Sequence, residues 1–91
     1  MEQMKRFYLV IDTSNKKGTK RYAYVQRVSN NVNILHVISG VARANSFYGL
    51  DPFFVEIARG KADAENTAKR WNDSHKAQGV YALDYMEGET L

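Results

Sequence analysis

The spacing of apolar residues along the chain predicts several short strands and one amphipathic helix. Five short runs are rich in apolar, β-branched and aromatic residues, as is typical of strands. Turn-forming residues separate the first three runs, so we expect the first two to form a hairpin. The predicted strands cover 5–12, 19–28, 32–39, 53–58 and 80–86.

Within the predicted hairpin, the alternation assigns side chains to opposite faces of the sheet. In the first strand, Leu9 lies on one face and Val10 on the other. In the second strand, Tyr22 and Tyr24 share a face, and Arg21 lies on the opposite face. The two tyrosines therefore either cover the core or form part of an interface.

A helix is predicted over 61–77. Ala64, Ala68, Trp71 and His75 follow the spacing i, i+4, i+7 and i+11, which places them on one helical face. Burying a ring as large as that of Trp71 contributes several kcal/mol, so we expect this residue to anchor the helix on the sheet.

The segment 40–52 is compatible with a long connection or a short helical turn. A glycine near each end and Pro52 favour the loop. Its aromatic residues, Phe47 and Tyr48, either close the open end of the core or form an exposed protein-binding hot spot. Together with Arg43 they make a second candidate interface.

These elements predict an α+β fold with the order β-β-β-β-α-β. The expected architecture is a two-layer sandwich: a four- to five-stranded, mainly antiparallel sheet with one helix in the C-terminal half. One helix covers only one face, so we expect the other face to be open to a partner. The length of 91 residues suits a single domain over 1–91, with a frayed tail at 87–91.

The composition argues against several kinds of chemistry. The chain has no cysteine, which excludes disulfides, thiol nucleophiles and cysteine-ligated metals. His36 and His75 are its only histidines and lack a third ligand at a suitable spacing, so we expect them to be structural. Nucleotide-binding and serine-hydrolase motifs are absent. We therefore expect no catalytic residue, cofactor or metal, and a protein that is not an enzyme.

The sequence contains no apolar run long enough for a membrane span, and its first residues lack the apolar core of a secretory signal. We therefore expect a cytoplasmic protein that does not bind membranes.

Charge is distributed unevenly, although the net charge is only +3. Residues 1–44 carry eight basic and two acidic residues, whereas 45–91 carry five basic and eight acidic ones. Such an excess of positive charge attracts phosphate backbones or acidic protein surfaces.

The basic residues gather at the predicted hairpin. Basic groups contact phosphates, and neighbouring aromatic rings stack on unpaired bases or pack in a protein interface. The alternative to an interface is a hairpin whose basic residues are simply solvated and whose tyrosines cover the core. The first candidate interface comprises Lys16, Lys17, Lys20, Arg21, Tyr22, Tyr24 and Arg27.

The basic hairpin at 16–28 and the helix opening at 60–72, with its run Lys-Ala-Asp-Ala-Glu-Asn-Thr-Ala-Lys-Arg-Trp-Asn, resemble the arm-type DNA-binding domains of phage and transposon integrases. The chain is equally similar to small stand-alone α+β proteins of phages and mobile elements. The segments 40–52 and 80–86 depart from the three-stranded integrase pattern. The integrase resemblance implies that the sheet face of Lys20 and its neighbouring tyrosines contacts DNA.

We therefore expect a non-enzymatic binding module that contacts nucleic acid, or a nucleic-acid-handling protein, through the basic hairpin and the open sheet face. The alternative is a phage-type protein–protein inhibitor, such as an anti-defence or anti-CRISPR protein, or a homodimeric adaptor.

Overall fold

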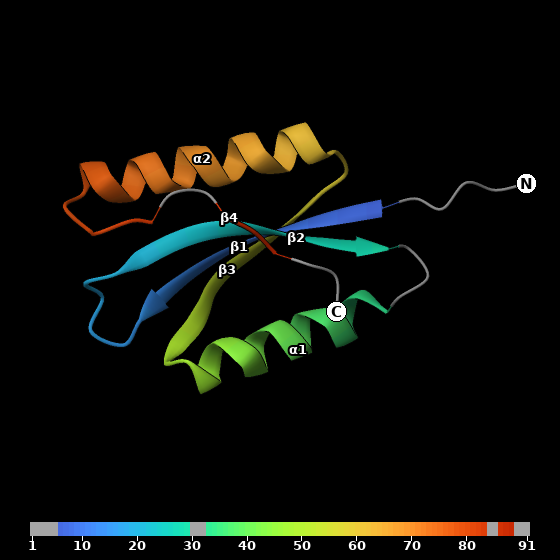
Figure 1. Ribbon diagram of the computed structural model, residues 1–91, viewed down its shortest axis with the longest axis horizontal. Helices are drawn as coiled ribbons and strands as arrows, with labels where there is room; N and C mark the ends of the chain where they lie inside the picture. Colours follow the sequence, from blue (N-terminus) through green and yellow to red (C-terminus); the bar gives the residue numbers. More distant parts are fainter. Residues whose placement is uncertain (1–5, 30–32, 84–85, 89–91) are drawn as a thin grey trace, which may run out of the picture.

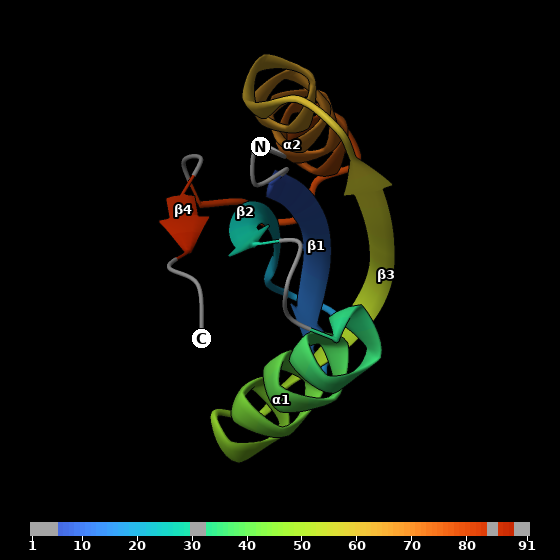
Figure 2. The same ribbon diagram turned by 90° about the vertical axis from the view of Figure 1, so that its right-hand side faces the viewer.

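The computed structural model describes residues 6–29, 33–83 and 86–88. They form β1 Arg6–Asn15, β2 Arg21–Ser29, α1 Ile34–Phe47, β3 Leu50–Ala58, α2 Lys61–Ala77 and β4 Met86–Gly88. The strands make one sheet in the order β3-β1-β2-β4, in which β1 is antiparallel to β2 and β3, and β2 is parallel to β4. Figures 1 and 2 show α1 and α2 on opposite sides of this sheet.

The predicted α+β fold, with a four-stranded and mainly antiparallel sheet, is confirmed. The helix in the C-terminal half spans the predicted residues 61–77. The hairpin of β1 and β2 is also confirmed, and Leu9 pairs with Gln26 in its register. The order of elements differs at the third element, which is helix α1 instead of a strand, so the described chain runs β-β-α-β-α-β.

The predicted strand at 32–39 and the predicted loop at 40–52 are wrong, because α1 runs through most of both. Asn33 caps this helix: its Oδ1 accepts a hydrogen bond from the backbone N–H of Leu35 at 3.0 Å. A capping asparagine satisfies one of the N–H groups that a helix leaves unpaired at its start. The helix then continues through Gly40, which was expected to begin the loop.

The face of the sheet that was expected to be open carries α1. Val37 and Val41 of α1 are buried against Leu9, Ile11 and Val28 of β1 and β2. These strand residues alternate as predicted, but their apolar side chains require cover, and α1 supplies it.

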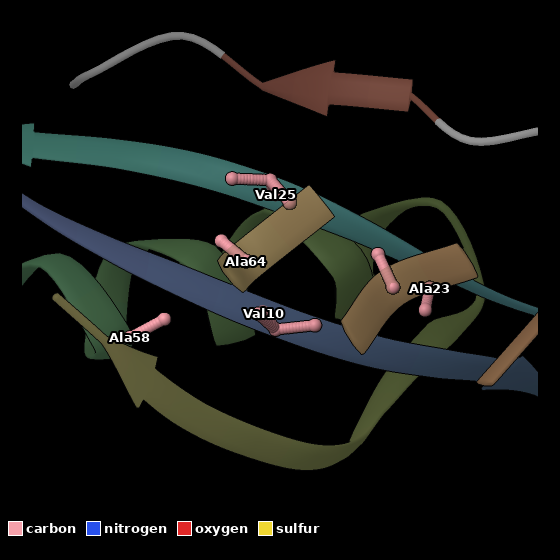
Figure 3. Close-up of a cluster of buried hydrophobic side chains, with 6 residues drawn as sticks. Val10, Ala23, Val25, Ala58 and Ala64 are labelled. Atoms are coloured by element: carbon pink, nitrogen blue, oxygen red, sulfur yellow. The ribbon is translucent and has the colours of Figure 1, made fainter. Parts of the chain in front are cut away.

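The opposite face of the same strands packs against α2. Val10, Ala23 and Val25 form a cluster with Ala64 and Ala68 of the helix, and Figure 3 shows the side chains of this cluster between strands and helix. All five residues are fully buried. Small alanine side chains let the helix lie close to the sheet. Trp71, which was expected to anchor the helix by its burial, is only partly buried and packs against the cluster.

The C-terminal strand is displaced from the predicted range 80–86. Tyr81 forms an isolated parallel bridge with Lys20, and β4 comprises residues 86–88. Of the expected frayed tail at 87–91, the first two residues belong to β4, and the others lie outside the described part of the chain.

Candidate functional site

The three lysines of the predicted hairpin lie in the turn between β1 and β2. Lys16, Lys17 and Lys20 are all exposed. Within the part of the chain that the structure describes, none of them forms an ion pair. No described carboxylate therefore lies within ion-pair distance of these lysines.

Hydrogen bonds hold this turn in a defined shape. Asn15 accepts a hydrogen bond at Oδ1 from the backbone N–H of Lys20, at 3.0 Å, and donates from Nδ2 to Thr19 Oγ1, also at 3.0 Å. Gly18 has a φ of 70°, a left-handed conformation that favours glycine. The turn therefore presents the lysines on an ordered backbone.

Aromatic rings lie at the same end of the sheet. Phe47 and Tyr48, at the C-terminal end of α1, are 84% and 75% exposed, and their ring centroids lie 5.2 Å apart in an edge-on arrangement. Leu50 pairs with Asn15, which brings the end of α1 beside the hairpin turn. Tyr81, which is 60% exposed, pairs with the other arm of the hairpin.

Figure 1 shows the hairpin turn, the end of α1 and the end of α2 on one side of the molecule. The two interfaces predicted separately from the sequence therefore meet in part at one surface. We call it the basic end, and define it by Lys16, Lys17, Lys20, Phe47, Tyr48 and Tyr81.

The other residues of the first candidate interface lie on two different faces. Tyr22 and Tyr24 are half-buried on the side of α1, with ring centroids 5.9 Å apart. Arg21 and Arg27 occupy the alternate positions of β2, on the side of α2. Arg43, from the second candidate interface, is exposed on α1. The structure therefore does not gather these five residues into one surface.

Tyr24 is half-buried and packs against the apolar cluster beneath α1, and its hydroxyl accepts a hydrogen bond from Asn45 Nδ2 at 3.2 Å. Burial raises the pKa of this hydroxyl above its ordinary value of 10.0; the bond from Asn45 opposes the rise, and the nearby Tyr22 adds to it. The phenol therefore resists ionisation in the folded state.

This raised pKa predicts a loss of stability in alkali. Below pH about 10, Tyr24 is neutral in both the folded and the unfolded chain, so its ionisation does not change the free energy of unfolding. Above that pH the unfolded chain ionises first, so the free energy of unfolding falls until the pH exceeds the folded-state pKa. Urea unfolding from pH 8 to 11 should show a steeper decline for the native chain than for Tyr24→Phe. An equal decline in the native chain and in Tyr24→Phe would contradict the assignment of this pH dependence to Tyr24.

A polar cluster that the sequence did not indicate joins α2 to the hairpin. Asp12 Oδ2 accepts hydrogen bonds from Nε and Nη2 of Arg21, at 3.1 and 2.9 Å. Its Oδ1 lies 2.9 Å from Nε2 of His75. The side chains of Asp12 and His75 are buried. Because an ionised carboxylate only accepts hydrogen bonds, the Nε2–H of His75 is the donor.

An aspartate that orients a histidine is also the arrangement of many general bases. In His75, however, the nitrogen that faces away from Asp12 is Nδ1, which is enclosed and has no hydrogen-bond partner among the described residues. A substrate therefore does not reach the ring nitrogen that would accept a proton. The geometry of Asp12, Arg21 and His75 favours a structural role, which agrees with the expectation for His75.

A groove of about 330 Å³ opens beside this cluster, between α2 and strands β1, β2 and β3. Phe54 and Trp71 form one wall, with ring centroids 5.3 Å apart and an interplanar angle of 70°. We call it the Trp71 groove; its lining residues are Asp12, Arg21, Phe54, Trp71, Ser74, His75 and Gln78.

The sequence pattern contained part of the signal for this groove. The alternation places Asp12 on the same face as Val10, and the helical period places His75 with Trp71, but the sequence did not predict that these two faces meet. Which strand lies beneath which helical turn is a matter of tertiary packing, and the pattern does not contain it.

Among the described residues, no group of three potential ligands is placed to hold a metal ion. None of their helices combines the length and the apolar character that a membrane crossing requires.

Comparisons with protein-family models, curated proteins and solved structures find no match for this chain. The fold and its surface define a small α+β protein that carries lysines and exposed aromatic rings at one end of its sheet.

Proposed function

We propose that this protein is a non-enzymatic binding module that contacts nucleic acid through the basic end. The observation that carries the proposal is the placement of three exposed lysines, which form no ion pair among the described residues, beside three exposed aromatic rings. Lysine side chains neutralise phosphates, and aromatic rings stack on bases of any sequence. A cytoplasmic location and the integrase-like hairpin are compatible with such a ligand.

The proposed surface differs from the one expected from sequence. Because α1 covers apolar residues on the expected open face, we place the contact at the end of the sheet. Arg21 binds Asp12, so we assign it first to the fold. Asp51, which pairs with Ser14, is exposed near this end and lowers its net positive charge. The proposal therefore depends chiefly on the lysines.

The test is a titration of labelled single-stranded and duplex oligonucleotides at about 50 mM salt, read by fluorescence anisotropy. We expect binding that weakens with salt, with a log–log slope of about −0.7 per phosphate contact for a single strand and −0.9 for duplex. The triple variant Lys16→Glu, Lys17→Glu, Lys20→Glu should bind at least about a hundredfold more weakly.

A matched control makes the same change in charge elsewhere. Arg59, Lys69 and Arg70 are exposed and lie outside the basic end, and their replacement by glutamate should weaken binding much less. Circular dichroism should show that both triple variants remain folded, since exposed substitutions usually change stability by about 0.5 kcal/mol or less. If neither probe binds the native chain in a salt-dependent manner, the proposal is wrong.

The exposed pair Phe47 and Tyr48 favours a second candidate, a phage-type protein–protein inhibitor or adaptor. Aromatic residues that protrude in this way are typical of interface hot spots. A partner captured from the native host after nuclease treatment, and lost in Tyr48→Ala, would favour this candidate over nucleic-acid binding.

A homodimer through an edge strand stays a prediction. The pairing of β3 with β1 shifts register between Asp12 and Thr13 of β1. Pro52 of β3 pairs with Thr13 and has no N–H to donate. Such irregularities protect an edge from pairing with another chain. The mass in solution at high concentration tests the dimer directly.

A further inference from the structure

We propose that the Trp71 groove holds one unstacked base of a single-stranded nucleic acid whose phosphates contact the lysines of the basic end. This inference rests on the proposed function and names its substrate class, which is single strand rather than duplex. The observation behind it is a groove with an aromatic wall that lies next to the hairpin.

The walls of the groove have the chemistry that a base requires. Trp71 is half-buried and Phe54 is 53% exposed, so both rings keep surface for contact with a flat ligand. Arg21 lies among the other lining residues, with a side chain that is 25% exposed. Aromatic rings and planar guanidinium groups are the surfaces on which proteins stack unpaired bases.

The groove is also held in place before a ligand arrives. Two hydrogen bonds from Arg21 to Asp12 fix the plane of the guanidinium, and His75 holds the other oxygen of the same carboxylate. A preorganised site loses less side-chain entropy on binding. The buried cluster therefore acts as the floor of the groove and supports its arginine.

The rim can pair with the edge of a base. Ser74 and Gln78 are exposed at the C-terminal end of α2 and line the groove. A hydroxyl and a carboxamide each contain both donor and acceptor groups, so the rim matches bases of different kinds. We therefore expect weak preference among bases.

The size and the position of the groove favour a single strand. Its volume of about 330 Å³ lies at the small end of ligand pockets and suits one flat ring system. Arg21 directly follows Lys20, and Asp12 lies three residues before Asn15, or about 10 Å along the strand. Neighbouring nucleotides can thus reach the lysines and the groove together. Duplex bases are paired and stacked, and do not enter.

Trp71 provides the direct measurement, because it is the only tryptophan in the chain. The probes are an oligothymidylate of about 12 nucleotides, an abasic oligomer with the same number of phosphates, and a duplex of equal length. We expect the oligothymidylate to quench the emission of Trp71 and to bind about tenfold more tightly than the abasic oligomer. The abasic oligomer and the duplex should leave the emission unchanged.

A pair of matched variants separates the groove from general binding. Phe54 and Ile57 lie in the same strand with exposures of 53% and 52%, but only Phe54 lines the groove. Phe54→Ala should lose about tenfold in affinity for oligothymidylate and retain its affinity for the abasic oligomer. Ile57→Ala should match the native chain with both probes.

The outcomes distinguish this inference from the function beneath it. Equal affinities for oligothymidylate and the abasic oligomer, with constant Trp71 emission, would overturn the groove while leaving binding at the basic end intact. Unchanged affinity of Phe54→Ala for oligothymidylate would also overturn the groove. Failure of all three probes to bind would overturn both.

Discussion

Replacement of Asp12 by alanine is expected to lower the free energy of unfolding by about 3 kcal/mol. The substitution removes a buried carboxylate that accepts three hydrogen bonds, two from Arg21 and one from His75. The remaining guanidinium and imidazole would then lose their shared partner in a region of restricted solvent access. Breaking a buried ion pair on one side is costly, because the charge left behind is uncompensated. Since Arg21 is 25% exposed, we take the low end of the usual range.

Urea unfolding at neutral pH measures this loss, and Asp73→Ala serves as the control. Asp73 is exposed on α2, so its removal should change stability by about 0.5 kcal/mol or less. A double-mutant cycle with Arg21→Ala should show coupling between the two residues. If Asp12→Ala unfolds at the same urea concentration as the native chain, the cluster does not stabilise the fold.

Asn72→Ala is expected to cost about 2 kcal/mol or more. The Nδ2 of Asn72 donates to the carbonyl oxygen of Ala23 at 3.0 Å, and its Oδ1 accepts from the N–H of Ala23 at 2.8 Å. The side chain thereby supplies both partners that a neighbouring strand would offer. Each buried backbone group left unpaired costs about 1–3 kcal/mol, and the higher helix propensity of alanine offsets only about 0.5 kcal/mol.

Asn66→Ala is the matched control, because Asn66 lies on the same helix and is exposed. This variant should be as stable as the native chain or slightly more so. Hydrogen exchange gives a local readout: the amide of Ala23 should exchange faster in Asn72→Ala than in Asn66→Ala. Equal exchange rates in the two variants would show that water or another group replaces Asn72.

The hairpin and α2 could be predicted from sequence because each is defined by local periodicity. Ala64, Ala68 and Trp71 recur with a helical period that no strand would share, and the helix has the predicted bounds. The segment of α1 was misassigned for a physical reason. Ile34 and Ile38 lie four residues apart, a spacing that puts them on one face in both a strand and a helix. Val37 and Val41 are buried in the same cluster; a strand would place Val37 on the face opposite to Ile34 and Ile38, and only a helix brings all four to one face.

The candidate site was predicted in part. Three lysines within five positions identified the hairpin turn as a candidate interface, and Phe47 with Tyr48 identified the segment that forms the end of α1. Their meeting at one end of the sheet depends on the pairing of Asn15 with Leu50, across 35 residues of chain. The partners in the Trp71 groove are further apart still, since Asp12 and His75 are separated by 63 positions.

The sequence by itself determined the class of fold, the composition of the hairpin and the face of α2 that is buried, because all three depend on residues within a few positions of one another. Only the tertiary structure decided that α1 covers the second face of the sheet, that Arg21 binds Asp12, and that Phe54 meets Trp71. Those contacts join distant segments, and they form because apolar strand faces must be covered and a buried charge must be paired.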